Sequence, residues 1–207
     1  MSFQPGQIIP PEGIKNFFKS QGLTYLSHPK EIYPGAGTLD WTKSEYYMAN
    51  LEAFEKLNHR YAMALETQVL APVELRFLGP QVGWGLFAGT DLKRLSWVGE
   101  YTGVVDLAQD EEDLTLVEGH FHSDYAWNFP DELPDGEFLE INALKQGNEM
   151  RFVNHSFTPN LSPDHTLWNG RWVTFFRTRR PIKAGEQLTI NYGEEYWATE
   201  HRTLEIL

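Results

Sequence analysis

The chain reads RFVNHSFTPN from Arg151 to Asn160 and GEQLTINYG from Gly185 to Gly193. Taken alone, an Asn-His-Ser cluster is typical of a polar turn, and a tyrosine followed by glycine is typical of a strand that ends in a turn. Neither explanation accounts for two long patterns in the same chain. These two stretches therefore decide how the rest of the sequence is interpreted.

Shorter patterns precede the two stretches. GWGLFA at residues 83–88 follows a predicted strand, and its glycines permit a turn tight enough to expose backbone amides and carbonyls to a ligand. GEYTG at 99–103 is typical of a half-buried strand ahead of a turn. SDY at 123–125 and INALKQGN at 141–148 complete the series. Each pattern is ordinary turn or strand chemistry on its own.

In this order, the patterns resemble the signatures of the SET-domain protein lysine methyltransferases: GxG, GEYxGE, DxY, RFxNHSxxPN and GEELTxDYG. The resemblance covers residues 73–197 of the chain. It implies a mostly β (α+β) structure, the SET-domain β fold of several small sheets with a knot-like C-terminal crossing, plus an N-terminal helical region. It also implies the activity of an S-adenosylmethionine-dependent protein-lysine N-methyltransferase that acts on a basic protein segment such as a histone tail.

The resemblance implies roles for individual residues. Tyr192 and Tyr101 are expected to be catalytic, with Tyr101 lining the channel for the substrate lysine. Ile190, on the substrate side, stands where many members have Phe or Tyr to limit the number of methyl groups, so the product number stays open. Two positions depart from the family patterns. Asn191 stands where DYG has Asp, and in SDY at 123–125 the acid directly precedes the tyrosine, whereas DxY has one residue between them. The implied contacts to S-adenosylmethionine are Val82, Gly83, Trp84, Tyr125, Arg151, Asn154, His155 and Trp197.

Methyl transfer to lysine needs a neutral amine. A free lysine has a pKa near 10.4, so only about a thousandth of it is neutral near pH 7.4. An apolar aromatic channel disfavours the ammonium by desolvation and so promotes loss of its proton. A phenol with a pKa of about 10 is a poor base at neutral pH. We therefore expect Tyr101 and Tyr192 to position the amine, with the proton lost to water.

Composition limits the other classes of site. A chain of 207 residues that is 41% hydrophobic and 14% aromatic can bury a sizeable core. It contains no cysteine, so it offers neither a disulfide framework nor a thiolate zinc site. Many family members close the substrate channel with a cysteine-rich zinc segment. Here Tyr196, Trp197 and the tail through Leu207 are the material for closure, and no metal is expected.

Negative charge is concentrated in one part of the chain. The formal net charge is −12, and residues 95–144 hold 13 Asp and Glu but no Lys or Arg. One interpretation is a solvated acidic face, and the other is an electrostatic trap for a basic peptide. The acidic balance argues against direct nucleic-acid binding. The trap predicts substrate contacts from Asp110, Glu111, Glu112 and Asp113.

Three parts are expected along the chain: a largely helical N-terminal extension at 1–68, a catalytic domain at 69–197 with an acidic insert region at 104–140, and a short tail at 198–207. The extension should hold a short helix near residues 12–20 and a long one over 40–66, with Asp40 as N-cap and an aromatic stripe in the core. It either packs on the catalytic core or forms a homodimer. Strands are predicted at 73–77, 84–88, 97–105, 138–142, 174–178 and 187–191.

Two alternatives stay open. A catalytically degenerate SET-like module that only binds a protein partner would share these motifs but lack affinity for the cofactor. Another small-molecule or nucleic-acid methyltransferase is disfavoured because the GxGxxG signature and a basic surface are both missing. The N-terminus has no signal-peptide pattern, and no apolar run approaches the roughly twenty residues that span a bilayer. We expect a soluble intracellular protein without membrane contact, in the cytoplasm or the nucleus.

Overall fold

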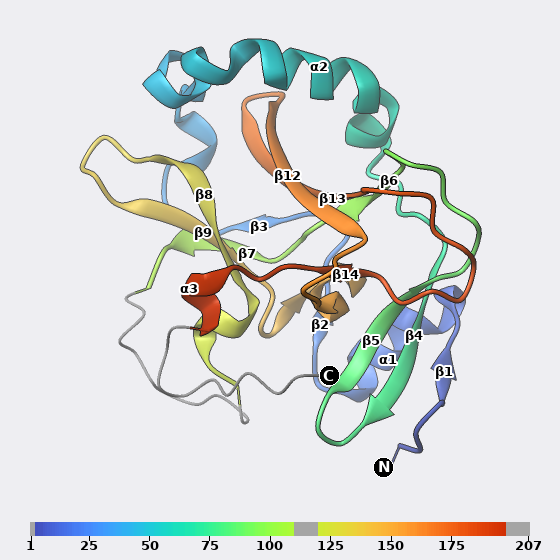
Figure 1. Cartoon of the computed structure of the whole chain (residues 1–207). Coiled ribbons are helices and arrows are strands. Elements are labelled where there is room, and N and C mark those ends of the chain that lie inside the picture. The colour runs from blue at the N-terminus through green and yellow to red at the C-terminus, as the bar shows by residue number, and fades with distance from the viewer. Residues whose placement is uncertain (1–2, 110–119, 198–207) are drawn as a thin grey trace.

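The computed structural model describes residues 3–109 and 120–197. Short strands dominate this part of the chain and form several small sheets (Figure 1). Three α-helices accompany them, α1 (Ile14–Ser20), α2 (Glu45–Thr67) and α3 (Glu194–Trp197). The expected fold class, mostly β with several small sheets, is confirmed.

The sheets are small and join distant parts of the chain. One has four strands, in the order β3 (Lys30–Glu31), β7 (Val104–Leu107), β9 (Phe138–Asn142) and β8 (Ala126–Glu132). Two have three strands, β1 (Ile8–Ile9), β4 (Val73–Gly79) and β5 (Gly83–Ala88), and β12 (Leu161–Trp168), β13 (Arg171–Thr178) and β6 (Trp97–Glu100). Two are parallel pairs, β2 (Thr24–Tyr25) with β10 (Gln146–Gly147), and β11 (Asn154–His155) with β14 (Thr189–Ile190).

The β11–β14 pair brings the two longest sequence motifs together. Asn154 lies opposite Thr189, and His155 lies opposite Ile190. Parallel neighbours need a long connection, and here it is the β12–β13 hairpin that follows β11. The backbone that carries the Asn-His motif is therefore fixed beside the strand that leads to Tyr192. The knot-like crossing itself stays a prediction.

The N-terminal region takes part in the sheets as well as contributing helices. Strand β1 pairs with β4, β2 with β10, and β3 with β7, so each of the short early strands joins a strand beyond residue 68. Packing of this region on the rest of the fold is thus observed directly. A domain boundary at residue 68 and a homodimer through the long helix stay proposals.

Helix α2 begins later than the sequence suggested. Its N-cap is Ser44, whose hydroxyl accepts from the amide of Tyr47. The prediction of Asp40 as the cap was wrong, because that carboxylate accepts from the Thr42 hydroxyl at 2.6 Å and pairs with Lys43 across a separate 3₁₀ turn.

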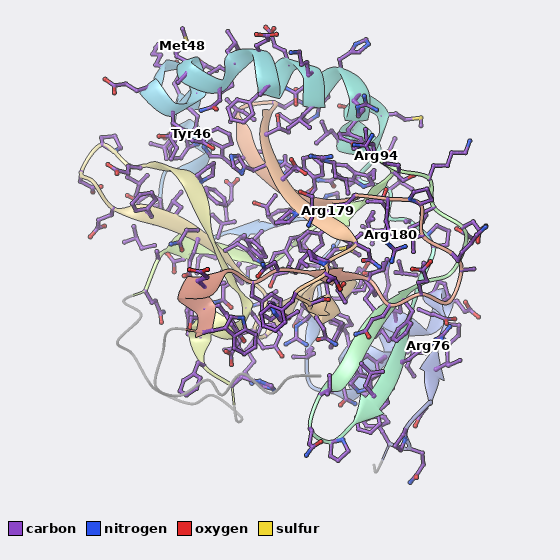
Figure 2. All side chains as sticks on the ribbon, viewed as in Figure 1. Tyr46, Met48, Arg76, Arg94, Arg179 and Arg180 are labelled. Carbon is purple, nitrogen blue, oxygen red and sulfur yellow. The ribbon has the colours of Figure 1, made fainter. Side chains whose placement is uncertain are left out.

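The inner face of α2 covers the β12–β13 hairpin (Figure 1). Phe54 packs edge-on against Trp172, and the side-chain amide of Asn58 donates to the carbonyl of Leu167 at 3.0 Å. The predicted aromatic stripe is therefore core packing. Figure 2 shows Tyr46 on the side of α2 that faces the sheets and Met48 on the opposite side, where it is exposed.

One predicted strand proved to be two. The run 97–105 divides into β6 and β7, which belong to different sheets, with residues 101–103 between them. Gly103 permits the change of sheet, since a Cβ there would lie 2.4 Å from the carbonyl oxygen of Asn142. β14 is shorter than the predicted 187–191. Strands β8 and β12 were not predicted, because β12 carries Pro163 and several polar residues.

Among the described residues, no helix has the length and apolar character needed to cross a membrane.

Candidate functional site

Two cavities meet in the middle of the molecule. The smaller, of about 100 Å³, is called the channel; Tyr101, Trp127, Phe176, Ile190 and Tyr192 are among its lining residues. The larger, of about 940 Å³, is called the groove; its lining comes from the loop before β5, from α1, and from the segments around β11, β14 and α3. Five residues line both cavities: Asp124, Tyr125, Arg151, Tyr192 and Tyr196.

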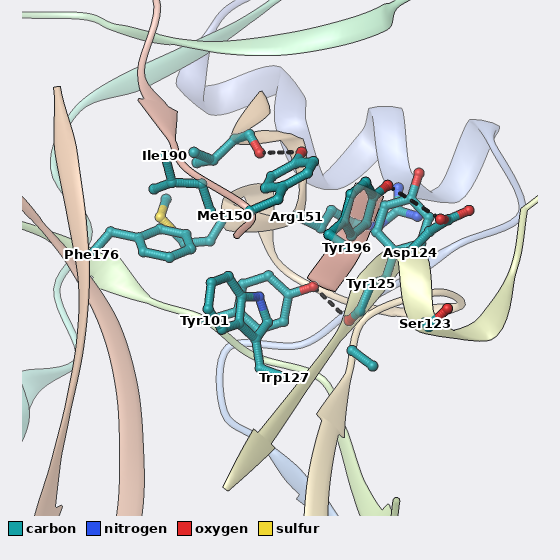
Figure 3. A pocket seen from close by; sticks show the side chains of 13 residues that line it. Tyr101, Ser123, Asp124, Tyr125, Trp127, Met150, Arg151, Phe176, Ile190 and Tyr196 are labelled. Atoms are coloured by element: carbon teal, nitrogen blue, oxygen red, sulfur yellow. Dashed lines mark hydrogen bonds between the residues drawn. The ribbon is translucent and has the colours of Figure 1, made fainter. Parts of the chain in front are cut away.

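The channel has an aromatic wall. The rings of Tyr101, Trp127 and Phe176 lie edge-on to one another, and each pair of ring centroids is 6.1 Å apart. The three residues come from the β6–β7 connection, from β8 and from β13, so three separate segments of chain build this wall (Figure 3). Ile190, which is 2% exposed, completes the lining from β14.

Tyr101 is held at both ends. Its amide donates to the carbonyl of Thr174 at 2.8 Å, and its hydroxyl donates to the carbonyl of Tyr125 at 2.7 Å (Figure 3). The side chain is 3% exposed, so the ring is fixed in the interior. A buried hydroxyl with a single defined partner is a rigid element of the channel.

Tyr192 connects the channel with the Asn-His motif. Its hydroxyl donates to the carbonyl of Val153 at 2.9 Å, and its amide donates to Nδ1 of His155 at 3.2 Å. Both bonds depend on the parallel pairing of β11 with β14, which brings residues 153–155 beside residues 189–192. The motif spacing thus places one tyrosine at the junction of the two cavities.

The tyrosines at this junction stay protonated at neutral pH. Burial raises the pKa of Tyr101, of Tyr125 and of Tyr192, and for Tyr192 the neighbouring phenols Tyr196, Tyr125 and Tyr101 raise it further. A phenol whose pKa lies above its ordinary value of about 10 cannot accept a proton at pH 7. These side chains can therefore position and polarise a ligand but cannot act as bases.

The GWG pattern and the Asn-His motif form adjoining parts of the groove. Asn154 donates its side-chain amide to the carbonyl of Trp84 at 3.3 Å. Gly83 has a φ of 76°, in the left-handed region that favours glycine. At Gly85, a Cβ would meet side-chain atoms of Gln187 and Leu78 at 2.9 Å. Each glycine of the pattern is thus required by backbone geometry or close packing.

His155 presents an unsatisfied donor. Its Nδ1 accepts the amide of Tyr192, and burial lowers the pKa of its ring, so the neutral ring carries its hydrogen on Nε2. Nε2 is buried and has no hydrogen-bond partner among the described residues, and the same holds for the indole nitrogen of Trp197. Buried donors without partners are costly unless a ligand accepts their hydrogens.

Arg151 supports the wall between groove and channel. Its Nε donates to the carbonyl of Ala143 at 2.9 Å and an Nη donates to the carbonyl of Leu144 at 3.2 Å. Its guanidinium lies 4.1 Å from the centre of the Tyr125 ring. These contacts fix Tyr125 beside the junction through a cation–π interaction.

Helix α3 covers the junction from the C-terminal side. The ring of Trp197 lies nearly parallel to that of Tyr192 and edge-on to His155 at 4.9 Å. The hydroxyl of Tyr196 donates to Asp124 at 3.2 Å (Figure 3). Within the described chain, aromatic packing therefore provides the cover on this side.

Most of the site residues predicted from the sequence line these two cavities. All eight residues expected at the cofactor line the groove, and Tyr101, Ile190 and Tyr192 line the channel. Their roles stay predictions. The expected substrate contacts Asp110, Glu111, Glu112 and Asp113 lie outside the described residues.

The acidic stretch is not one surface. Glu100 is buried and forms an ion pair with Arg171, Glu140 is buried against His122, and Asp131 is buried as well. These carboxylates cannot attract a substrate from solution. Any trap depends on the remaining acids of residues 95–144.

Several lining residues were missed by sequence reasoning. Phe176 in the channel lies on a strand whose pattern indicated only β structure, and Trp127 lies on β8, which was not predicted. Phe17, Gln21 and Leu23 in the groove belong to the N-terminal region, where no motif was found. The aromatic run after Tyr125 was a usable signal for Trp127, whereas nothing in the sequence pointed to the three N-terminal residues.

Comparison with known proteins decides the family. The family model described as SET domain matches residues 83–193, which is more than half of the chain. The chain belongs to the SET-domain family. Among curated relatives, the SET chain is 32% identical over 110 residues to histone-lysine N-methyltransferase MEDEA of Arabidopsis thaliana, and 36% identical over 121 residues to histone-lysine N-methyltransferase EHMT1 of Homo sapiens.

Each of these matches covers only part of this chain and only a small part of the relative. They cover 53% and 56% of this SET chain, which spans only 15% of MEDEA and 9% of EHMT1. A solved structure of ATXR5 in complex with histone H3.1 is similar over 93% of this chain and 89% of its own, with a TM-score of 0.62 and 16% identity. At that identity the likeness shows the fold alone, and it extends to the N-terminal region.

Proposed function

We propose that this chain is an S-adenosylmethionine-dependent protein-lysine N-methyltransferase that acts on a basic protein segment such as a histone tail. The observation that carries the proposal is the wall shared by the groove and the channel, where Tyr192 touches both cavities. Two different ligands can approach that wall from two sides. A transfer reaction between two substrates requires such an arrangement.

The groove fits S-adenosylmethionine. Its volume of about 940 Å³ lies within the range of about 300–1,000 Å³ usual for small-molecule sites. The unpartnered Nε2 of His155 and Nε1 of Trp197 offer donors to a nitrogen heterocycle, and the aromatic faces nearby suit a flat purine. When bound, S-adenosylmethionine supplies an electrophilic methyl group on a sulfonium. Val82, Gly83, Trp84, Tyr125, Arg151, Asn154, His155 and Trp197 are the residues assigned to hold it.

The channel suits the side chain of lysine. Its aromatic walls from Tyr101, Trp127 and Phe176 favour the neutral amine over the ammonium through desolvation. Tyr101 and Tyr192 keep their protons, so they position the amine and stabilise developing charge, and the proton of the substrate leaves to water. Neither tyrosine is a base in this scheme.

The proposed substrate class is based on the names of the relatives and on the net charge of this chain. MEDEA and EHMT1 are named histone-lysine N-methyltransferases, and ATXR5 was solved with histone H3.1. A chain with a formal net charge of −12 favours a basic partner over a nucleic acid. We infer that a basic protein segment such as a histone tail is the substrate.

A methyl-transfer assay tests this proposal directly. Purified protein is incubated with isotopically labelled S-adenosylmethionine and core histones, and modified lysines are identified by mass spectrometry. Labelled methyl-lysine in a histone is the expected result. Calorimetry with S-adenosylhomocysteine accompanies it: absence of both binding and transfer would favour a degenerate SET module that only binds a partner.

A further inference from the structure

Two neighbouring loops carry a cluster of positive charge. Residues 91–96 lead into β6, and residues 178–186 run from the end of β13 toward β14. Together they hold five basic and two acidic residues, a net charge of +3 in a chain whose net charge is −12. The five cations are all exposed and are called the basic surface: Lys93, Arg94, Arg179, Arg180 and Lys183. Figure 2 shows Arg94, Arg179 and Arg180 gathered on one side of the molecule.

Backbone hydrogen bonds hold the two loops against each other. Leu92 and Ile182 exchange amide-to-carbonyl bonds of 2.8 and 2.9 Å. The amide of Leu95 donates to the carbonyl of Thr178 at 3.0 Å, and the amide of Thr178 donates to the carbonyl of Ser96 at 2.9 Å. The basic surface therefore stands on a paired backbone, and a ligand that binds it has little further backbone to order.

Leu95 adopts an unusual conformation within this pairing. Its φ is 62°, in the left-handed region that a side chain with a Cβ rarely adopts. Its carbonyl accepts the hydroxyl of Tyr61 on α2 at 3.0 Å, in addition to the bond that its amide makes. Backbone held in a sparsely populated region occurs more often at functional sites than elsewhere. Leu95 directly follows Lys93 and Arg94, so these bonds fix the turn that carries two of the five cations.

Three cations of the basic surface have no carboxylate partner. Lys93, Arg94 and Arg179 form no ion pair within residues 3–109 and 120–197, and Arg94 donates its Nε to the carbonyl of Arg179 at 3.2 Å. Arg180 and Lys183 each pair with one carboxylate, at 2.8 and 2.7 Å. Exposed ion pairs of this kind are weak, so an anion of higher charge density can replace the carboxylates.

The composition of the two loops distinguishes between kinds of polyanion. None of the large apolar side chains that are exposed in the described part of the chain lies in either loop. A stable interface between proteins is centred on buried apolar or aromatic side chains. The phosphate backbone of a nucleic acid requires mainly a density of positive charge, and the guanidinium of arginine matches the geometry of phosphate. The basic surface therefore suits a nucleic acid better than an acidic protein.

We propose that the basic surface binds the phosphate backbone of a DNA duplex without reading its sequence. The net charge of −12 led to the expectation of no direct nucleic-acid contact, but that value describes the whole chain and not this surface. None of the five cations lines the channel or the groove. DNA bound here leaves both cavities open, so the inference goes beyond the proposed function and does not depend on it.

Binding of DNA at several salt concentrations tests the proposal. A fluorescein-labelled duplex of about 20 base pairs and mixed sequence is titrated with the full chain, and fluorescence anisotropy gives the association constant K. We expect log K to fall with log salt concentration with a slope of about −4.5, which is about 0.9 for each of five phosphate contacts. The variant Lys93→Gln/Arg94→Gln/Arg179→Gln should bind about tenfold or more weakly at low salt, with a slope of about −1.8.

A matched control removes the same charge elsewhere. Lys19→Gln/Lys30→Gln/Lys56→Gln changes three exposed lysines on α1, β3 and α2 and should leave the slope unchanged. Poly-glutamate in place of the duplex should bind at least about tenfold more weakly. The proposal is overturned if the wild-type chain does not bind the duplex at low salt, or if the two triple variants lose affinity equally. Poly-glutamate binding as tight as that of the duplex would also overturn it and would assign the surface to an acidic protein.

Discussion

The backbone amide of Tyr192 donates a hydrogen bond to Nδ1 of His155 at 3.2 Å. The residue assigned to the substrate lysine thereby orients the ring assigned to the cofactor. This contact joins β11 to the segment that follows β14, so the two sequence motifs form one structural unit. A substitution at either residue should therefore change the position of the other.

The Tyr101 hydroxyl should matter for both stability and turnover. Tyr101→Phe removes the donor to the buried carbonyl of Tyr125 and leaves that acceptor without its partner. We expect a loss of about 1–3 kcal/mol in the free energy of unfolding, measured by urea denaturation. Turnover on a lysine peptide should fall as well. Tyr33→Phe, on a half-buried tyrosine outside both cavities, is the control, and equal effects from the two variants would contradict a specific role for Tyr101.

Ile190 should control how many methyl groups the channel accepts. It is 2% exposed and lines a cavity of about 100 Å³, so a larger side chain must take space from the substrate amine. Ile190→Phe is expected to shift the product toward fewer methyl groups. Mass spectrometry of a methylated peptide over time measures that distribution. An unchanged distribution in a folded variant would remove Ile190 from the specificity assignment.

Acid should destabilise the protein through His155. Because burial lowers the folded-state pKa of this ring, the unfolded state binds its proton first as pH falls below about 6.5. The contribution of the neutral ring is complete above that pH and is lost progressively below it, down to the folded-state pKa. His155→Gln should therefore lose less stability than the wild-type protein between pH 7.5 and pH 5.5 in urea denaturation. Identical losses would show that His155 does not titrate in this range.

The acidic stretch is tested through substrate affinity. Replacing Asp110, Glu111, Glu112 and Asp113 by their amides should raise KM for a basic peptide and flatten its dependence on ionic strength, because surface attraction is screened by salt. The same number of amides placed at Glu45, Glu52, Glu55 and Glu66 on α2 serves as the control. If KM at low salt is the same in both variants and the wild type, these acids are surface charge without a role in binding.

The candidate site followed from the sequence because its motifs are local. Asn154, His155 and Tyr192 each lie in a stretch that resembles a motif of a known family, and that resemblance predicted them as site residues. The end of α1 could not be found in this way. Gln21 and Leu23 reach the groove only because β2 pairs with β10, and a pairing of two-residue strands leaves no hydrophobic period to detect.

The fold, too, could be predicted where it depends on local sequence, but not where it depends on contacts between distant residues. Strand β9 matched its expected bounds, 138–142, whereas the run from Trp97 to Val105 gave no sign of its division between two sheets. That division depends on Gly103 approaching the backbone of Asn142, a contact between distant parts of the chain. Likewise, Asp40 resembles a helix cap, but a neighbouring lysine and threonine occupy its carboxylate.

The most direct measurement of the central claim is turnover by Tyr192→Phe beside calorimetric binding of S-adenosylhomocysteine. The variant loses the hydroxyl at the junction while its backbone amide can still reach His155. We expect kcat on a lysine peptide to fall by about 10²–10³, with cofactor affinity retained. Tyr47→Phe on α2 is the control and should match the wild type. Unchanged turnover in Tyr192→Phe would contradict the assignment of this tyrosine to methyl transfer.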